Sequence, residues 1–263
     1  MSSPMQNETT GSGKPLVLVP GGLTGWLSWI PHAEALSKSR QVTRVQLHSI
    51  ALGLSGDPLP PDYSVEYEVA GLENTLNEMG IAQADFAGWS YGGEISLSFA
   101  IRNPNRVKSL TLIEPPAYWV LRSRGLLSDE HLKEQTFQQS LAVDSVSEEQ
   151  LIAFLEYAGF ARPGENLRTL PQWPVWAEHR HSLRMGDAPF VHEDSIERVR
   201  NFDKPVLMVK GEGSADYYYA IIDILAEEFP NASVVTYPGG HAPHIVSMQA
   251  FMERFTQFLS ESA

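Results

Sequence analysis

Short apolar runs alternate with amphipathic stretches along most of this 263-residue chain, and this alternation limits its possible folds more than any other feature. The apolar runs predict strands at 16–19, 42–47, 85–88, 107–113, 206–209 and 234–237. The stretches between them predict helices at 26–38, 65–79, 94–103, 217–229 and 248–259. Strands that alternate with helices of this length indicate βαβ units. We therefore expect an α/β fold with helices on both faces of a mostly parallel sheet. About six strands are expected, because little chain precedes Pro15.

The segment 117–197 interrupts the alternation. It contains no convincing strand, its clearest helical pattern covers 147–157, and it holds three of the six tryptophans, at positions 119, 173 and 176. We interpret it as a helical lid inserted between two parts of one core, 1–116 and 198–263.

Composition excludes several classes of function. The formal net charge is −13, which makes nucleic acid and anionic membranes improbable partners. The chain has no cysteine, so disulfides, thiolate nucleophiles and iron–sulfur clusters are ruled out. Residues 1–14 are polar, and no later run approaches the 18 or so apolar residues of a spanning helix. We expect a cytoplasmic monomer or homodimer that is not bound to a membrane.

The strongest chemical motif is Gly-Trp-Ser-Tyr-Gly-Gly at 88–93. It fits the G-x-S-x-G elbow, in which a sharp turn between a strand and a helix presents a nucleophilic serine. The context agrees, since an apolar run precedes the motif and a helical stretch follows it. Ser90 is thus the expected nucleophile, and the alternative is a glycine-rich turn with an incidental serine.

A serine hydroxyl needs a base to remove its proton. His241 is the candidate, because it follows the last predicted strand and so lies at the same edge of the sheet as the elbow. His244, three residues later, is the rival, and we expect it to pack or hydrogen-bond locally. No further ligands accompany this histidine pair, so we expect no metal site.

Two residues compete as the acid that orients His241. In the usual loop after the strand 206–209, the acid position is occupied by Ser214, and Asp216 follows two residues later. The other candidate is Glu114, which ends the strand 107–113 and precedes two prolines. We favour Glu114 and keep Asp216 as the alternative.

The oxyanion that forms during acyl transfer requires two preorganised donors. The amide of Tyr91, directly after the nucleophile, is one. The other is expected from the turn at 20–23, with Gly22 preferred and Leu23 as the alternative. We expect Leu23 and Trp89 to line the substrate pocket with the lid residues Trp173 and Trp176, although either lid tryptophan fits the lid core equally well.

Together, the elbow, the turn Pro20-Gly21-Gly22 and the Gly240-His241 pair resemble the α/β-hydrolase superfamily over 15–259. The resemblance implies an acyl-enzyme on Ser90 and no cofactor. The chain departs from the family pattern in having Pro20 where a histidine is usual, and it lacks the common Arg-Gly pair in 50–55. A narrower likeness is to zearalenone lactonases, which share the turn Val19-Pro20-Gly21-Gly22-Leu23 and place a glutamate acid where Glu114 stands.

These observations predict a serine hydrolase that cleaves a carboxylic ester or lactone of a largely apolar small molecule. Hydrolysis of a carbon–carbon bond and cofactor-free perhydrolase chemistry use the same three residues and remain alternatives. A non-catalytic small-molecule-binding protein is the alternative from another class.

Overall fold

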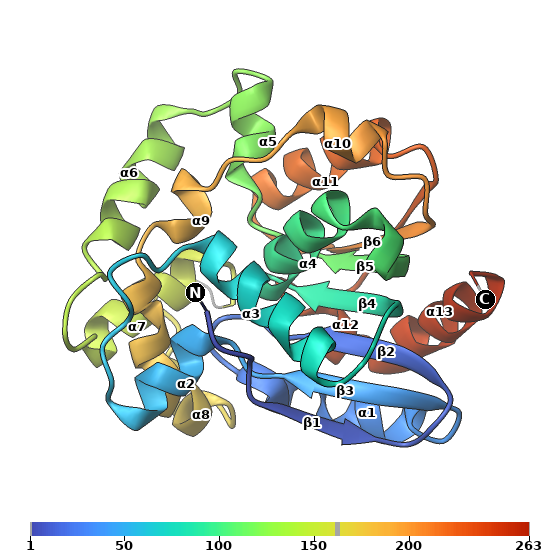
Figure 1. The fold of residues 1–263 in the computed structure, drawn as a ribbon. Helices are drawn as coiled ribbons and strands as arrows, with labels where there is room; N and C mark the ends of the chain where they lie inside the picture. Colours follow the sequence, from blue (N-terminus) through green and yellow to red (C-terminus); the bar gives the residue numbers. More distant parts are fainter. Residues whose placement is uncertain (1, 161–163, 263) are drawn as a thin grey trace.

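A computed structural model describes residues 2–160 and 164–262 and contains one seven-stranded sheet (Figure 1). The expected ranges 1–116, 117–197 and 198–263 therefore each include residues outside this description. The strand order is β1-β3-β2-β4-β5-β6-β7. The strands are β1 (Asn7–Thr10), β2 (Lys14–Val19), β3 (Arg40–Val45), β4 (Ala84–Trp89), β5 (Val107–Ile113), β6 (Val206–Gly211) and β7 (Ala232–Tyr237).

The expected count of about six strands omits β1. Strands β2 to β7 are parallel and correspond to the six predicted runs, whereas β1 pairs antiparallel with β3 at the edge of the sheet. All four β1 residues, Asn-Glu-Thr-Thr, are exposed, so the strand has no apolar signature. Pairing with the open edge of β3 holds it in place, and hydrophobic periodicity cannot reveal a strand of this kind.

Helices cover both faces of the sheet. One face packs against α3 (Val65–Glu78), α4 (Tyr91–Arg102) and α11 (Asp216–Glu228), and the other against α1 (Ile30–Leu36) and α13 (Met248–Glu261). The remaining core elements are η1 (Gly25–Trp29), α2 (His48–Ser55), η2 (Pro104–Arg106) and α12 (Pro243–Val246). Side chains alternate between the two layers along the strands, as Val17 and Val19 do against Leu16 and Leu18. No helix within the described ranges is long and apolar enough to cross a bilayer.

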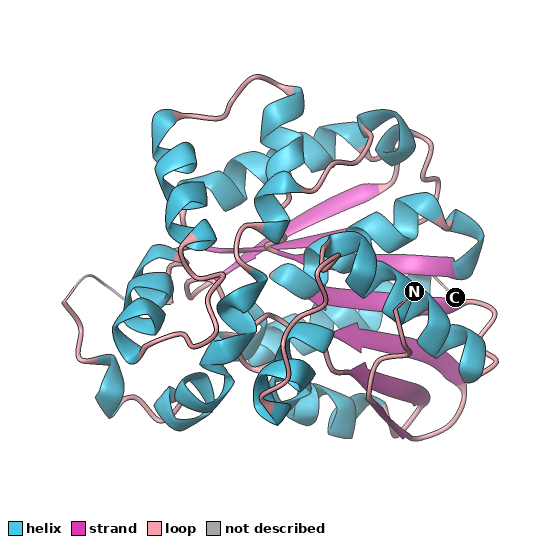
Figure 2. Ribbon diagram, turned by 60° about the vertical axis from the view of Figure 1, so that its left-hand side comes forward, coloured by secondary structure: helices cyan, strands magenta, loops and turns pink. Residues whose placement is uncertain are grey.

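In its described part, the segment between β5 and β6 contains helices joined by loops and no strand, as predicted. It contains α5 (Tyr118–Ser123), α6 (Asp129–Gln139), α7 (Glu148–Tyr157), η3 (Leu167–Thr169), α8 (Trp173–His179), η4 (Arg180–Met185), α9 (Ala188–Val191) and α10 (Ile196–Arg200). Helix α7 begins after Ser147, whose side chain forms a capping box with Gln150. Helices α6 to α9 lie beyond one end of the sheet, and they have an apolar cluster of their own around Leu151, Leu155 and Trp176 (Figures 1 and 2). This helical insertion lies over the carboxyl ends of the parallel strands.

Candidate active site

Ser90 lies in a strained turn between β4 and α4. Its φ of 53° and ψ of −127° fall outside the regions that L-residues ordinarily adopt, a conformation that costs about 1–3 kcal/mol. Two glycines make the turn sterically possible. A Cβ on Gly88 would lie 2.4 Å from the carbonyl oxygen of Gly92, and one on Gly92 would lie 2.3 Å from that of Pro20. The residue after Ser90 is the first of α4, so the positive end of the helix dipole faces the serine.

In the structure, the predicted base His241 lies between Ser90 and the predicted acid Glu114. His241 follows β7, and its Nε2 lies 2.8 Å from the Oγ of Ser90. The Nδ1–H of His241 donates to Oε2 of Glu114, also at 2.8 Å. His241 and Glu114 are both buried, whereas Ser90 is half-buried at the end of the relay. This tautomer leaves the Nε2 lone pair directed at the serine hydroxyl.

Glu114 directly follows β5 and is fixed by several donors. Its second oxygen, Oε1, accepts the amide of Gly211 at 2.6 Å and the hydroxyl of Ser214 at 2.5 Å. Ser214 thus occupies the usual acid position but donates to the acid instead of replacing it. The alternative acid, Asp216, is exposed at the start of α11. Of the two predicted carboxylates, the structure brings only Glu114 to His241.

Tyr218 is a residue of this site that the sequence analysis missed. Its ring stacks on the imidazole of His241, with centroids 4.3 Å apart, and its hydroxyl lies 3.2 Å from Nε2. Burial raises the pKa of Tyr218 well above 10, so the hydroxyl stays protonated. Tyr218 belongs to a run of three tyrosines near the start of α11, and no motif distinguishes it from its neighbours.

The rival histidine, His244, packs away from the relay. Its ring lies among Trp29, Trp89 and Phe251, and neither ring nitrogen has a hydrogen-bond partner among the described residues. Burial lowers the pKa of His244 well below 6.5. Within residues 2–160 and 164–262, no group of three His, Asp or Glu side chains is arranged to hold a metal ion.

The turn at 20–23 lies beside the serine and is held by the helical insertion. Gly22, Leu23 and Tyr91 all line the cavity that contains Ser90. The hydroxyl of Ser182 donates to the carbonyl of Gly22, and Nδ1–H of His179 donates to the carbonyl of Leu23 at 2.9 Å. Fixing both carbonyls also fixes the planes of the peptides that follow. No sequence motif indicates these two supports.

The cavity over Ser90 is small and mostly aromatic, with a free volume of about 40 Å³. Among its described lining residues none carries an ionised side chain; they are Gly21, Gly22, Leu23, Trp89, Ser90, Tyr91, Pro116, Tyr118, Gln138, Phe154, Tyr157, Ala158, Phe160, Met185, Pro189, Tyr217 and Tyr218. Trp89 and Phe160 also border a second cavity of about 330 Å³ on the other side of His241.

Only two of the four predicted pocket residues line the cavity over Ser90. Leu23 and Trp89 line the cavity over Ser90, as expected. Trp176 instead lines the second cavity, where its ring meets the edge of Phe160. Trp173 is partly buried in the apolar cluster of the insertion, with Arg168 over its ring. Neither tryptophan lines the cavity over Ser90; the alternative, that they belong to the core of the insertion, holds instead, because α8 turns both rings toward its apolar cluster.

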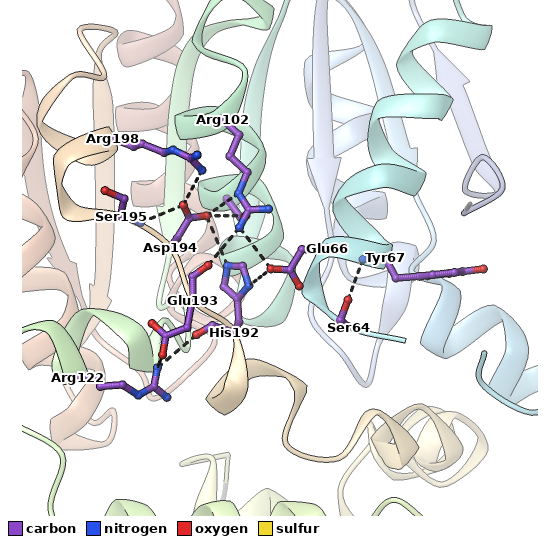
Figure 3. A network of polar contacts seen from close by, with 11 residues as sticks. Ser64, Glu66, Tyr67, Arg102, Arg122, His192, Glu193, Asp194, Ser195 and Arg198 are labelled. Carbon is purple, nitrogen blue, oxygen red and sulfur yellow. Dashed lines mark hydrogen bonds and ion pairs between the residues drawn. The ribbon is translucent and has the colours of Figure 1, made fainter. Parts of the chain in front are cut away.

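A charged network joins the end of the insertion to the core helices. Figure 3 shows the ring of His192 between the carboxylates of Glu66 on α3 and Asp194. Its Nδ1 lies 2.9 Å from Glu66 Oε1 and its Nε2 3.6 Å from Asp194 Oδ2. Arg102 on α4 donates to Asp194 at 2.9 Å. Burial favours the neutral imidazole, but these carboxylates outweigh it and raise the pKa of His192 to about 9.

Comparison with known proteins agrees with this geometry. A family profile described as alpha/beta hydrolase fold matches residues 14–247. The chain belongs to the α/β-hydrolase family. The expectation drawn from the elbow, the turn and the Gly-His pair is thereby confirmed at the level of the superfamily, while the likeness to zearalenone lactonases stays a prediction.

Three of the proteins that this α/β-hydrolase resembles are named as hydrolytic enzymes. The 2-hydroxy-6-oxo-2,4-heptadienoate hydrolase of Pseudomonas putida is 38% identical over 106 residues, which cover 39% of this chain and only 38% of that protein. The pimeloyl-(acyl-carrier protein) methyl ester esterase of Nitrosomonas europaea is 24% identical over 94% of this chain and 96% of that protein. The enol-lactonase of Burkholderia xenovorans superposes with a TM-score of 0.73 at 18% identity, covering 97% of this chain and 96% of that one. Hydrolase is the level of description that these likenesses support.

Proposed function

We propose that this protein is a serine hydrolase that cleaves a carboxylic ester or lactone of an uncharged, largely apolar small molecule. The observation that carries the proposal is the relay from Glu114 through His241 to Ser90, with 2.8 Å at each step, which opens into a cavity whose described lining contains no ionised residue. The esterase and lactonase among the similar proteins are consistent with that chemistry.

In the proposed reaction, Ser90 Oγ attacks the acyl carbon while His241 Nε2 takes its proton. Glu114 keeps the imidazole in the required tautomer and stabilises the imidazolium. The amides of Gly22 and Tyr91 hold the oxyanion, with Leu23 as the alternative to Gly22, and two such donors contribute several kcal/mol of transition-state stabilisation. His241 then protonates the leaving oxygen. Water, activated by the same histidine, releases the acyl group from Ser90.

Carbon–carbon bond hydrolysis is the second candidate, because the relative with 38% identity is named for a heptadienoate substrate. Such a substrate carries a carboxylate, and a carboxylate in a buried site is stabilised most strongly by a paired cation. The described lining of the cavity contains neither arginine nor lysine. This difference favours an uncharged ester or lactone.

The test is a panel of p-nitrophenyl esters, simple lactones and one dienoate carbon–carbon substrate, assayed with the wild type and with Ser90→Ala. We expect turnover of esters or lactones that falls by at least about 1,000-fold in Ser90→Ala. A fluorophosphonate should label the wild type but not the variant. A folded protein that neither turns over any substrate nor reacts with the fluorophosphonate would contradict the proposal, and preference for the dienoate would select the second candidate.

A further inference from the structure

Glu134, on helix α6 of the insertion, is a buried carboxyl group that the proposed mechanism does not use. It is 3% exposed. Its Oε1 accepts two hydrogen bonds, from the hydroxyl of Tyr118 at 2.8 Å and from Nε2 of Gln138 at 3.1 Å. Its Oε2 has no hydrogen-bond partner among the described residues. A buried carboxyl that is only half satisfied is costly, which makes a purely structural role a poor explanation.

Both residues that donate to Glu134 line the cavity over Ser90. Gln138 supplies the one amide side chain in the described lining, and it lies on the insertion, whereas Ser90 lies at the sheet edge. One N–H of Gln138 is committed to Glu134. The other N–H and the side-chain oxygen of Gln138 remain as a donor and an acceptor for a ligand. The bond to Glu134 fixes their orientation.

The electrostatics of this cluster favour neutral ligands. Burial raises the pKa of Glu134 to about 8, although the bonds from Tyr118 and Gln138 oppose the rise, and so the carboxyl is mostly protonated at neutral pH. The charged group that acts on it is Glu130 on the same helix, and burial keeps the hydroxyls of Tyr118, Tyr217 and Tyr218 neutral. With no cation in the described lining, an anionic group would gain nothing here.

We propose that Gln138, oriented by Glu134, forms a second polar subsite that binds a carbonyl or hydroxyl oxygen of an uncharged substrate, away from the bond that Ser90 attacks. The inference rests on the proposed hydrolase function and narrows its substrate class. Aromatic rings around the subsite, including Tyr118 stacked on Phe190 at 3.6 Å, shield that hydrogen bond from water. Gln138 is then a specificity-determining residue, and Glu134 is a positioning residue that acts through it.

The experiment compares p-nitrophenyl heptanoate with oxoheptanoate esters in which the ketone is moved one carbon at a time along the chain. For the wild type we expect one ketone position to raise kcat/KM about tenfold, mainly through a lower KM, since one net hydrogen bond contributes up to about 1.5 kcal/mol. Gln138→Leu should bring that ratio close to one. Glu134→Leu should also lower it, whereas Glu134→Gln, which keeps an acceptor for both donors, should preserve it.

The matched control is Gln139→Leu, the next residue on α6, which is exposed and bonds Asp187 at 2.7 Å. It should retain the wild-type ratio. A wild type that favours no ketone position, or a ratio that Gln138→Leu leaves unchanged, would overturn the inference.

A binding measurement separates this inference from the proposed function. Calorimetric titration of Ser90→Ala with heptanamide and with the matching oxoheptanamide requires no turnover. About tenfold tighter binding of the oxo compound, lost in Ser90→Ala/Gln138→Leu, supports the subsite even if every ester assay fails. Equal affinities would contradict the subsite while leaving hydrolysis by Ser90 intact.

Discussion

The two halves of the candidate site are built in different ways. In the half that belongs to the sheet, Ser90, Glu114 and His241 each follow the end of a parallel strand, and backbone geometry fixes two of them at positive φ. In the half that belongs to the helical insertion, Gln138, Ser182 and His179 are placed by side-chain packing between short helices. The proposed chemistry therefore depends on backbone geometry at the strand ends, and the proposed specificity and support depend on side-chain packing.

The largest expected effect tests the sheet half. Glu114→Gln should lower kcat by about 1,000-fold or more, because it removes the charge that stabilises the imidazolium and supplies a donor where His241 Nδ1–H needs an acceptor. Asp216→Asn should stay close to wild type, since Asp216 is exposed on α11. Steady-state kinetics on the best ester decides the matter, provided that circular dichroism shows both variants folded. Similar rates for the two variants would break the assignment of the acid.

The second prediction tests whether the insertion supports the chemistry. Ser182→Ala removes the hydroxyl that holds the carbonyl of Gly22, which shares a peptide plane with the amide of Leu23, the alternative oxyanion donor. If the Leu23 amide holds the oxyanion, kcat should fall about tenfold with little change in KM, because a misaligned amide costs part of the oxyanion stabilisation. Ser140→Ala, in an exposed turn of the insertion, is the matched control. An unchanged kcat in Ser182→Ala would mean that the amide of Gly22 is the donor or that the sheet half holds the turn unaided.

Tyr218→Phe should have a smaller effect, a reduction in kcat of about three- to tenfold. The ring can still stack on His241, but the hydroxyl near Nε2 is lost. Tyr237→Phe, which removes a hydroxyl that donates to the carbonyl of Ala250 on α13, serves as the control. Pre-steady-state burst kinetics would show whether acylation or deacylation is slowed. A kcat equal to that of the wild type would exclude a role for the hydroxyl.

The last prediction has the smallest expected effect on activity and concerns stability. It tests the charged network around His192, which joins the insertion to the core helices. The pKa of His192 is about 9 in the folded protein against an ordinary 6.5, so its stabilising contribution is fully present below about pH 6.5 and is lost as the pH rises through about 9. A shift of this size corresponds to about 3 kcal/mol. Glu66, Asp194 and Glu94 are the carboxyl groups that face it, with Arg102 nearby.

His192→Gln should therefore flatten the fall in unfolding free energy between pH 6.5 and 9.5, measured by urea denaturation at each pH. The other titrating groups are common to both proteins, so the difference between the two curves isolates His192. Parallel curves would show that the charge on His192 does not contribute to the stability of the folded protein.

Sequence patterns predicted the two halves to different degrees, for a physical reason. The six parallel strands, the elbow at Ser90, His241 and Glu114 could all be located, because strand ends and tight turns demand particular residues at fixed spacing. Strand β1 has no apolar residue to mark it. Tyr218, Ser182 and His179 depend on which residues of distant helices meet in space, and no local spacing encodes that. The same limit explains why the sequence left open whether Trp173 and Trp176 line the pocket or belong to the core of the insertion.

The cavity over Ser90 has a kinetic consequence. Its volume of about 40 Å³ accommodates the centres of no more than a few water molecules, so we expect an ester of ten or more heavy atoms to enter only after side chains around it have moved. Substrate entry would then include a separate first-order conformational step, as in enzymes whose loops open and close around the substrate. Acylation by a bulky inhibitor should saturate with concentration at a ceiling set by that opening. The specificity constant should also lie well below the diffusional limit and be insensitive to added viscogen.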